Sequence, residues 1–127
     1  MKFLVADDSA TMRRIVINSL QRIGYADFVE AEDGEAAFAS FDSSIDFVIT
    51  DWNMPGMTGL DLARAVRSHA AGGSVPILMV TTRSVREDIL AAVEAGVNNY
   101  IVKPFTPQVL KEKIDLVLSA TATRQSA

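Results

Sequence analysis

The feature that most constrains this chain is a strict alternation of short β-branched runs with amphipathic stretches, repeated five times along 127 residues. The runs, such as KFLVA at 2–6 and DFVIT at 46–50, are nearly continuous in apolar residues. The stretches between them carry apolar residues at helical spacing, as in the segment 10–23. Apolar strands separated by helices predict a parallel sheet that is covered on both faces.

The boundaries follow from turn and capping residues. Thr58 with Asp61, and Ser84 with Glu87, have the form of capping boxes that begin helices. We expect strands at 2–6, 28–31, 46–50, 75–80 and 99–102. We expect helices at 10–23, 34–42, 58–72, 84–95 and 107–118. Because crossovers are right-handed, few arrangements remain, and we predict a doubly wound, flavodoxin-like α/β fold with strand order 2-1-3-4-5.

Composition narrows the class of protein. Apolar residues make up 49% of the chain, which is enough for the core of one domain, expected at 1–120 with a flexible tail at 121–127. The chain has no cysteine, and therefore no disulfide and no thiolate metal site. A net charge of -4 argues against nucleic-acid binding. With no signal peptide or membrane-spanning stretch in the sequence, we expect a cytoplasmic protein with no membrane partner.

Polar residues gather where four of the predicted strands end. In the predicted order these ends meet at one edge of the sheet, where such folds bind their ligands. The residues are Asp7 and Asp8, Asp51, Thr81 and Thr82, and Lys103. An aspartate after a strand is often only a helix N-cap, and for Asp7 and Asp8 taken alone this alternative stays open.

Three carboxylates in so small a space repel one another, and a divalent cation relieves the repulsion. Oxygen ligands without histidine or cysteine favour Mg²⁺. The central acid, Asp51, is the candidate nucleophile that would form an aspartyl phosphate. Lys103 and the metal would supply positive charge to the phosphoryl oxygens, and Thr81 a hydrogen bond.

Four other residues are expected to lie outside this chemistry. Arg13 and Arg14 are expected on a solvated helix face. Trp52 is expected to be more exposed than a typical tryptophan, because it follows the end of a strand. His69 is expected to be structural, far from the strand-end cluster.

With these residues in place, the sequence resembles the receiver domain of bacterial two-component response regulators, and within that family the single-domain chemotaxis regulators. The resemblance covers residues 2–118 and is carried by KFLVADDS, TMRRIV, VEAEDG, TDWNMPG, PILMVT and YIVKPFT. It implies a cis Lys103–Pro104 bond and a phosphoryl group transferred to Asp51 from a histidine kinase. It also implies Mg²⁺ bound by Asp8, Asp51 and the Asn53 backbone carbonyl, with Asp7 acting through water.

The resemblance implies a switch as well. Thr81 would move toward the phosphoryl group, and Tyr100 would swing into the space it leaves. The movement of these two side chains would reshape a surface that binds the flagellar motor switch protein. That surface would comprise Arg86, Ile89, Tyr100, Val102, Phe105, Thr106 and Lys113. The resemblance also implies a monomer, and a protein that is not an enzyme apart from its own phosphorylation and dephosphorylation. Thr82 and Arg83 depart from the family pattern, which leaves the phosphate lifetime and a dedicated phosphatase as partner open.

Three other functions compete with this interpretation. A phosphatase with an aspartyl-phosphate intermediate usually places its nucleophile after the first strand and adds a cap, whereas Asp51 follows the third strand. A flavodoxin needs a phosphate-cradling loop after the first strand, and DDSAT would repel phosphate. A phosphorelay carrier or phosphate sink that never contacts the motor stays open.

Overall fold

Five parallel strands form one sheet in the computed structural model, which describes residues 1–82 and 86–126. The strands are β1 (Lys2–Ala6), β2 (Asp27–Ala31), β3 (Phe47–Asp51), β4 (Ile77–Thr81) and β5 (Asn99–Val102). They lie in the order β2-β1-β3-β4-β5, and every neighbouring pair is parallel. The predicted doubly wound sheet is therefore confirmed, with β3 at its centre.

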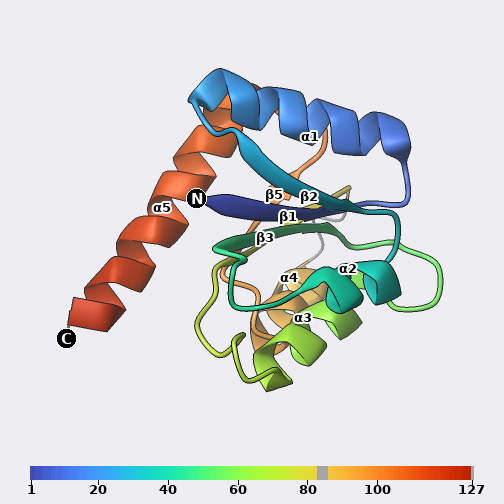
Figure 1. The fold of residues 1–127 in the computed structure, drawn as a ribbon, viewed down its shortest axis with the longest axis vertical. Helices are drawn as coiled ribbons and strands as arrows, with labels where there is room; N and C mark the ends of the chain where they lie inside the picture. The colour runs from blue at the N-terminus through green and yellow to red at the C-terminus, as the bar shows by residue number, and fades with distance from the viewer. Residues whose placement is uncertain (83–85, 127) are drawn as a thin grey trace.

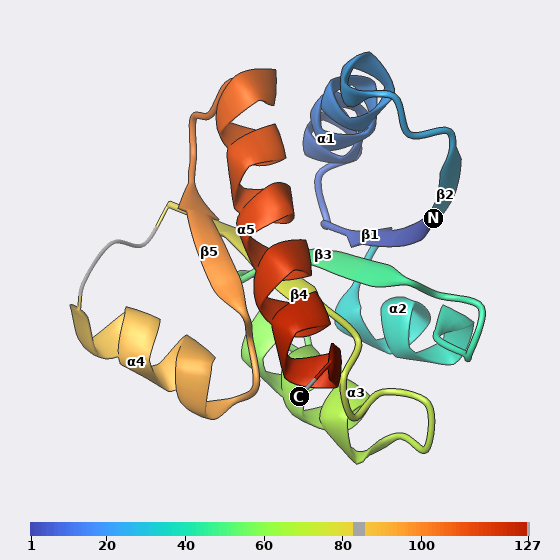
Figure 2. The same cartoon turned by 90° about the vertical axis from the view of Figure 1, so that its left-hand side faces the viewer.

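Helices cover both faces of this sheet (Figure 1; Figure 2). One face carries α1 (Ala10–Ile23) and α5 (Pro107–Ser126), and the other carries α2 (Gly34–Ser40), α3 (Gly59–Ser68) and α4 (Arg86–Glu94). Because successive strand residues point to opposite faces, each strand feeds both apolar layers. Phe3 packs in the layer beneath α1 and α5, and its neighbour Leu4 packs in the layer beneath α2, α3 and α4.

The helix ends show why the elements begin and end where they do. The Ser9 hydroxyl accepts the Met12 N–H at 3.2 Å and caps α1, which ends at Gly24 with a φ of 115°. The capping box predicted at Thr58 and Asp61 is present at the start of α3. The second predicted capping box, at Ser84 and Glu87, lies outside the described residues.

Several predicted boundaries were wrong. β3 and β4 begin and end later than expected, so that Asp51 and Thr81 are the last residues of their strands. α3 ends at Ser68 rather than near 72. α5 ends at Ser126 rather than at 118. No glycine or proline follows Pro107, so nothing in the sequence stops the helix.

Two further observations bear on the expectations from sequence. The Lys103–Pro104 peptide bond is cis, as the resemblance implied. Among the helices of the described residues, none has the length and apolar character needed to cross a membrane.

Candidate functional site

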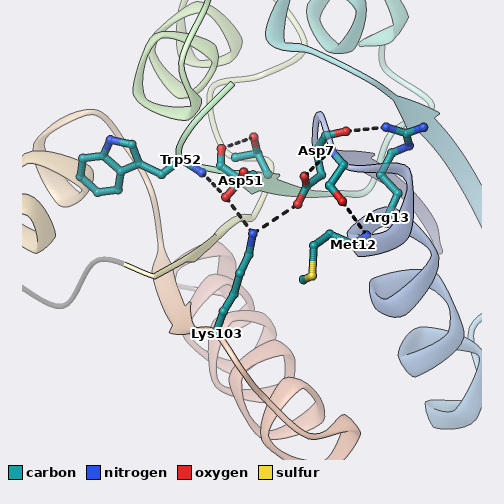
Figure 3. Close-up of polar contacts among 8 residues, drawn as sticks. Asp7, Met12, Arg13, Asp51, Trp52 and Lys103 are labelled. Carbon is teal, nitrogen blue, oxygen red and sulfur yellow. Dashed lines mark hydrogen bonds and ion pairs between the residues drawn. The ribbon is translucent and has the colours of Figure 1, made fainter. Parts of the chain in front are cut away.

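Acidic and basic side chains meet at the edge of the sheet where the strands end (Figure 3). The ammonium nitrogen of Lys103, which follows β5, lies 3.1 Å from Oδ1 of Asp51 and 3.5 Å from Oδ2 of Asp7. One carboxylate oxygen each from Asp7, Asp8 and Asp51 lie within 4.8 Å of one another. The structure therefore brings together the three acids and the lysine that the sequence placed at one edge.

Burial changes the acidity of Asp7. Asp7 is 3% exposed and Asp51 is 7% exposed, whereas Asp8 is exposed to solvent. Burial raises the pKa of Asp7 because it disfavours the charged form, and the Asp51 carboxylate raises this pKa further. The Ser9 N–H, which donates to Oδ1 of Asp7 at 2.8 Å, and the Lys103 ammonium oppose the shift. Negative charge on Asp7 is therefore costly without a cation.

The donor set fits magnesium. All three candidate ligands are carboxylates, and neither histidine nor cysteine joins this group among the residues that the structure describes. When the three acids are ionised, the single charge of Lys103 leaves the cluster negative. Hard oxygen donors around a small, negatively charged space are what Mg²⁺ requires, and one exposed ligand leaves room for the waters that Mg²⁺ keeps.

The Asp51 carboxylate is held in a defined orientation. Its Oδ1 accepts the Trp52 N–H at 2.9 Å as well as the Lys103 ammonium. The first residue of α3, Gly59, donates its N–H to the Trp52 carbonyl at 2.9 Å. A Cβ at Gly59 would lie only 2.2 Å from the Asp51 carbonyl oxygen, so α3 can begin this close to β3 only because residue 59 is glycine.

Trp52 corrects one expectation. Its side chain is buried, with 7% of its surface exposed, and belongs to the apolar layer beneath α2, α3 and α4. Figure 3 shows the indole ring pointing away from Asp7 and Lys103. The prediction of an exposed tryptophan was wrong because the indole packs into this apolar layer, although the backbone has already passed the end of β3.

Thr81 and Tyr100 lie on the same face of the sheet. Thr81 is buried at the end of β4, and its carbonyl accepts the Lys103 N–H at 2.8 Å. Tyr100 pairs with Met79, which is two residues before Thr81 on the same strand. Since residues two apart share a face, Tyr100 is the diagonal neighbour of Thr81 across β4 and β5.

Five of the seven residues predicted for the partner face line one open cavity of about 380 Å³: Tyr100, Val102, Phe105, Thr106 and Lys113. The Lys113 ammonium lies 5.3 Å from the centre of the Tyr100 ring, within range of a cation–π contact. Ile89 is half-buried on α4 and is not part of this lining. The side chain of Arg86 lies outside the described residues.

The remaining predicted residues divide between exposed and structural positions. Asn53 is exposed, two residues after Asp51. Thr82 is exposed beside the site, and Arg83 lies outside the described residues. The ring of His69 packs edge-on against Phe38 and Phe41, as expected for a structural histidine.

Two arginines with defined contacts were missed. Arg13 is 15% exposed rather than solvated, and its contacts are described below. Arg67 of α3 lies at the opposite edge of the sheet, where its guanidinium donates to the carbonyls of Gly72 (2.9 Å), Val75 (2.6 Å) and Gly96 (2.8 and 3.1 Å) and to Oδ1 of Asn98 (2.9 Å). These partners are up to 31 residues away, so no local sequence signal could have identified them.

Comparison with known proteins identifies the family. The model of the response regulator receiver domain matches residues 3–115. The chain is 56% identical over 120 residues to the chemotaxis protein CheY1 of Helicobacter pylori, which covers 93% of this chain and 97% of that protein. It is 52% identical over 118 residues to the chemotaxis protein CheY of Pseudomonas aeruginosa, covering 92% and 95%.

A solved structure agrees with these sequence relatives. The chemotaxis protein CheY4 of Vibrio cholerae superimposes with a TM-score of 0.83 at 36% identity, over 91% of this chain and 97% of that one. Proteins of this kind are regulators and not classical enzymes, in line with the expectation from sequence. The chain therefore belongs to the response regulator receiver domain family, as a receiver domain of the CheY chemotaxis type.

Proposed function

We propose that this chain is a single-domain response regulator that is phosphorylated on Asp51 by a histidine kinase with Mg²⁺ and then binds the flagellar motor switch protein. One observation carries the proposal: Asp51 ends the central strand with its carboxylate 3.1 Å from the Lys103 ammonium and beside two further acids. The similarity to chemotaxis proteins over more than nine-tenths of the chain supports it.

The chemistry assigned to these residues is phosphoryl transfer. An oxygen of the Asp51 carboxylate attacks the phosphorus of a phosphohistidine, so that a P–O bond forms, the P–N bond breaks and the imidazole leaves with the bond's electron pair. The Lys103 ammonium neutralises charge that develops on the phosphoryl oxygens, and the Thr81 hydroxyl donates to one of them. Asp8, Asp51 and the Asn53 carbonyl would hold Mg²⁺, with Asp7 acting through water, and the bound ion supplies further positive charge there.

Replacing the phosphorylated residue tests this assignment. D51N keeps the shape of the side chain but removes the nucleophilic charge, so incubation with acetyl phosphate and Mg²⁺ should leave its mass unchanged. The wild-type protein and the control D27N, at an exposed position on β2, should each gain one phosphoryl group. Phosphorylation of D51N at the wild-type yield would contradict the assignment.

The output surface of the proposal is the face formed by α4, β5 and α5. Tyr100 supports it, because this residue is the diagonal neighbour of Thr81 and also lines the open cavity beside Val102 and Lys113. A movement of Thr81 toward a phosphoryl group would leave space on the face that Tyr100 shares. A change in the Tyr100 rotamer would then alter the cavity that a partner contacts, which is how a local charge change reaches a binding surface.

Peptide affinity measures this coupling. A peptide from the motor switch protein should bind about 5–150-fold more tightly when beryllofluoride, a stand-in for the phosphoryl group, occupies Asp51. Y100A should reduce that ratio without blocking phosphorylation. L116A is the control, because Leu116 is 59% exposed on α5 outside the cavity lining. Equal affinities in both states would reject motor binding and favour a phosphorelay carrier or phosphate sink.

A further inference from the structure

Arg13 makes contacts that its position on α1 does not explain. Its neighbour Arg14 is exposed to solvent, but the Arg13 side chain is 15% exposed and points back toward the strand ends. One terminal nitrogen of the guanidinium donates to the backbone carbonyl of Asp7, and Nε lies 3.3 Å from Oε1 of Glu30 on β2 (Figure 3 shows the contact with Asp7). Arg13 therefore links α1 to the residue that follows β1 and to β2, at the edge of the sheet where the three acids lie.

The other polar groups of Asp7 are held as well. Its N–H donates to the Ala31 carbonyl at 3.1 Å, Oδ1 accepts the Ser9 N–H, and Oδ2 faces the Lys103 ammonium. The contact from Arg13 differs from these because it falls on the Asp7 carbonyl, which shares one planar peptide unit with the N–H of Asp8. Arg13 thus holds the peptide that joins two of the three carboxylate residues.

We propose that Arg13 is a positioning residue for the magnesium site, which fixes the Asp7–Asp8 peptide so that both carboxylates are in place before the ion binds. This inference rests on the proposed function, since it concerns the same ion. Mg²⁺ requires near-ideal octahedral geometry, so ligands on a loose turn would have to be ordered on binding at a cost in conformational entropy. Residues that orient metal ligands typically change metal affinity about 10–100-fold when they are replaced.

Charge alone would have the opposite effect. A guanidinium near a cation site repels the ion, so removing it should tighten Mg²⁺ binding if Arg13 acted only through its charge. Positioning predicts that the same replacement weakens binding. Lysine at position 13 keeps the charge but lacks the planar fork with which Arg13 reaches the Asp7 carbonyl and Glu30 together. The sign of the change in affinity therefore separates the two effects.

The experiment is a titration of the full chain with MgCl₂ by isothermal calorimetry. R13M and R13K should both bind Mg²⁺ about tenfold or more weakly than the wild-type protein. The matched control R14M removes the same charge from an exposed neighbouring position and should stay within about twofold, as expected for a screened surface charge. At saturating Mg²⁺, R13M should reach the wild-type level of phosphorylation by acetyl phosphate, because its ligands and nucleophile are unchanged.

Two outcomes would overturn this inference. If the wild-type protein binds Mg²⁺ and R13M binds it equally well or more tightly, Arg13 does not position the ligands. If R13M proves unfolded by circular dichroism, R13K decides, and unchanged affinity in that variant is equally contrary. Failure of the wild-type protein to bind Mg²⁺ is a different result, since it rejects the proposed function itself.

Discussion

At the scale of single residues, Asp7 links the chemistry of the site to the stability of the fold. Its carboxyl is buried beside Asp51, and both facts raise its pKa above the ordinary value of 3.8. A group with a raised pKa in the folded state binds protons more readily when folded. In the absence of metal, its contribution to stability therefore falls as the pH rises from about 3.8 through the raised pKa.

D7N should consequently stabilise the metal-free protein at neutral pH, because it removes a buried charge and keeps the side-chain shape. The expected gain is about 1 kcal/mol, or a rise in Tm of roughly 2–5 °C, and it should vanish at pH values where Asp7 is protonated. Thermal unfolding across a pH series in EDTA measures it, with D27N as the exposed control. A lower Tm for D7N at neutral pH would show that the charged form of Asp7 is not costly.

At the scale of elements, the junction between β3 and α3 depends on Gly59. The Asp51 carbonyl oxygen and the Met79 sulfur lie 2.2 and 2.9 Å from the position that a Cβ would take there. Even the smallest side chain would therefore push α3 away from the end of the strand that carries Asp51.

G59A should lower the free energy of unfolding by about 1–3 kcal/mol, the usual cost of overpacking. G73A is the matched control, because nothing lies within 4 Å of a Cβ at Gly73, and it should change stability by less than about 0.5 kcal/mol. Urea denaturation monitored by circular dichroism measures both. Equal effects of the two substitutions would mean that the close approach at Gly59 is not a constraint.

The individual helices and strands differ in how well sequence patterns predict them. Strands and helices whose apolar residues repeat with a clear period were predicted to within a few residues. The burial of their apolar faces determines where these elements form. The continuation of α5 to Ser126 was missed, since residues 121–126 lack the apolar stripe that marks the earlier part of the helix. Once a helix is formed, adding a residue costs little, and only a stop signal would have ended it.

At the scale of the whole molecule, the strand order and the gathering of acids at one edge of the sheet were predictable for the same reason. Strict alternation and right-handed crossovers leave few sheets, and in any of them parallel strands end at a common edge. Asp51, Lys103 and the acids after β1 were found in this way. Arg13 could not be found, because its role depends on a carbonyl and on Glu30, 17 residues away, neither of which has a sequence signature.

The arginine at the far edge gives the molecule an asymmetry along its strands. Arg67 ties the loop before β4 to the Gly96 carbonyl, so the C-terminal end of α4 is anchored to α3. The other end of α4 follows β4, whose last residue is Thr81, and so begins on the side of the sheet where Asp51 lies. With its C-terminal end held, α4 would pivot about that end, and a displacement at the strand ends beside Asp51 would move the N-terminal end of α4 the most.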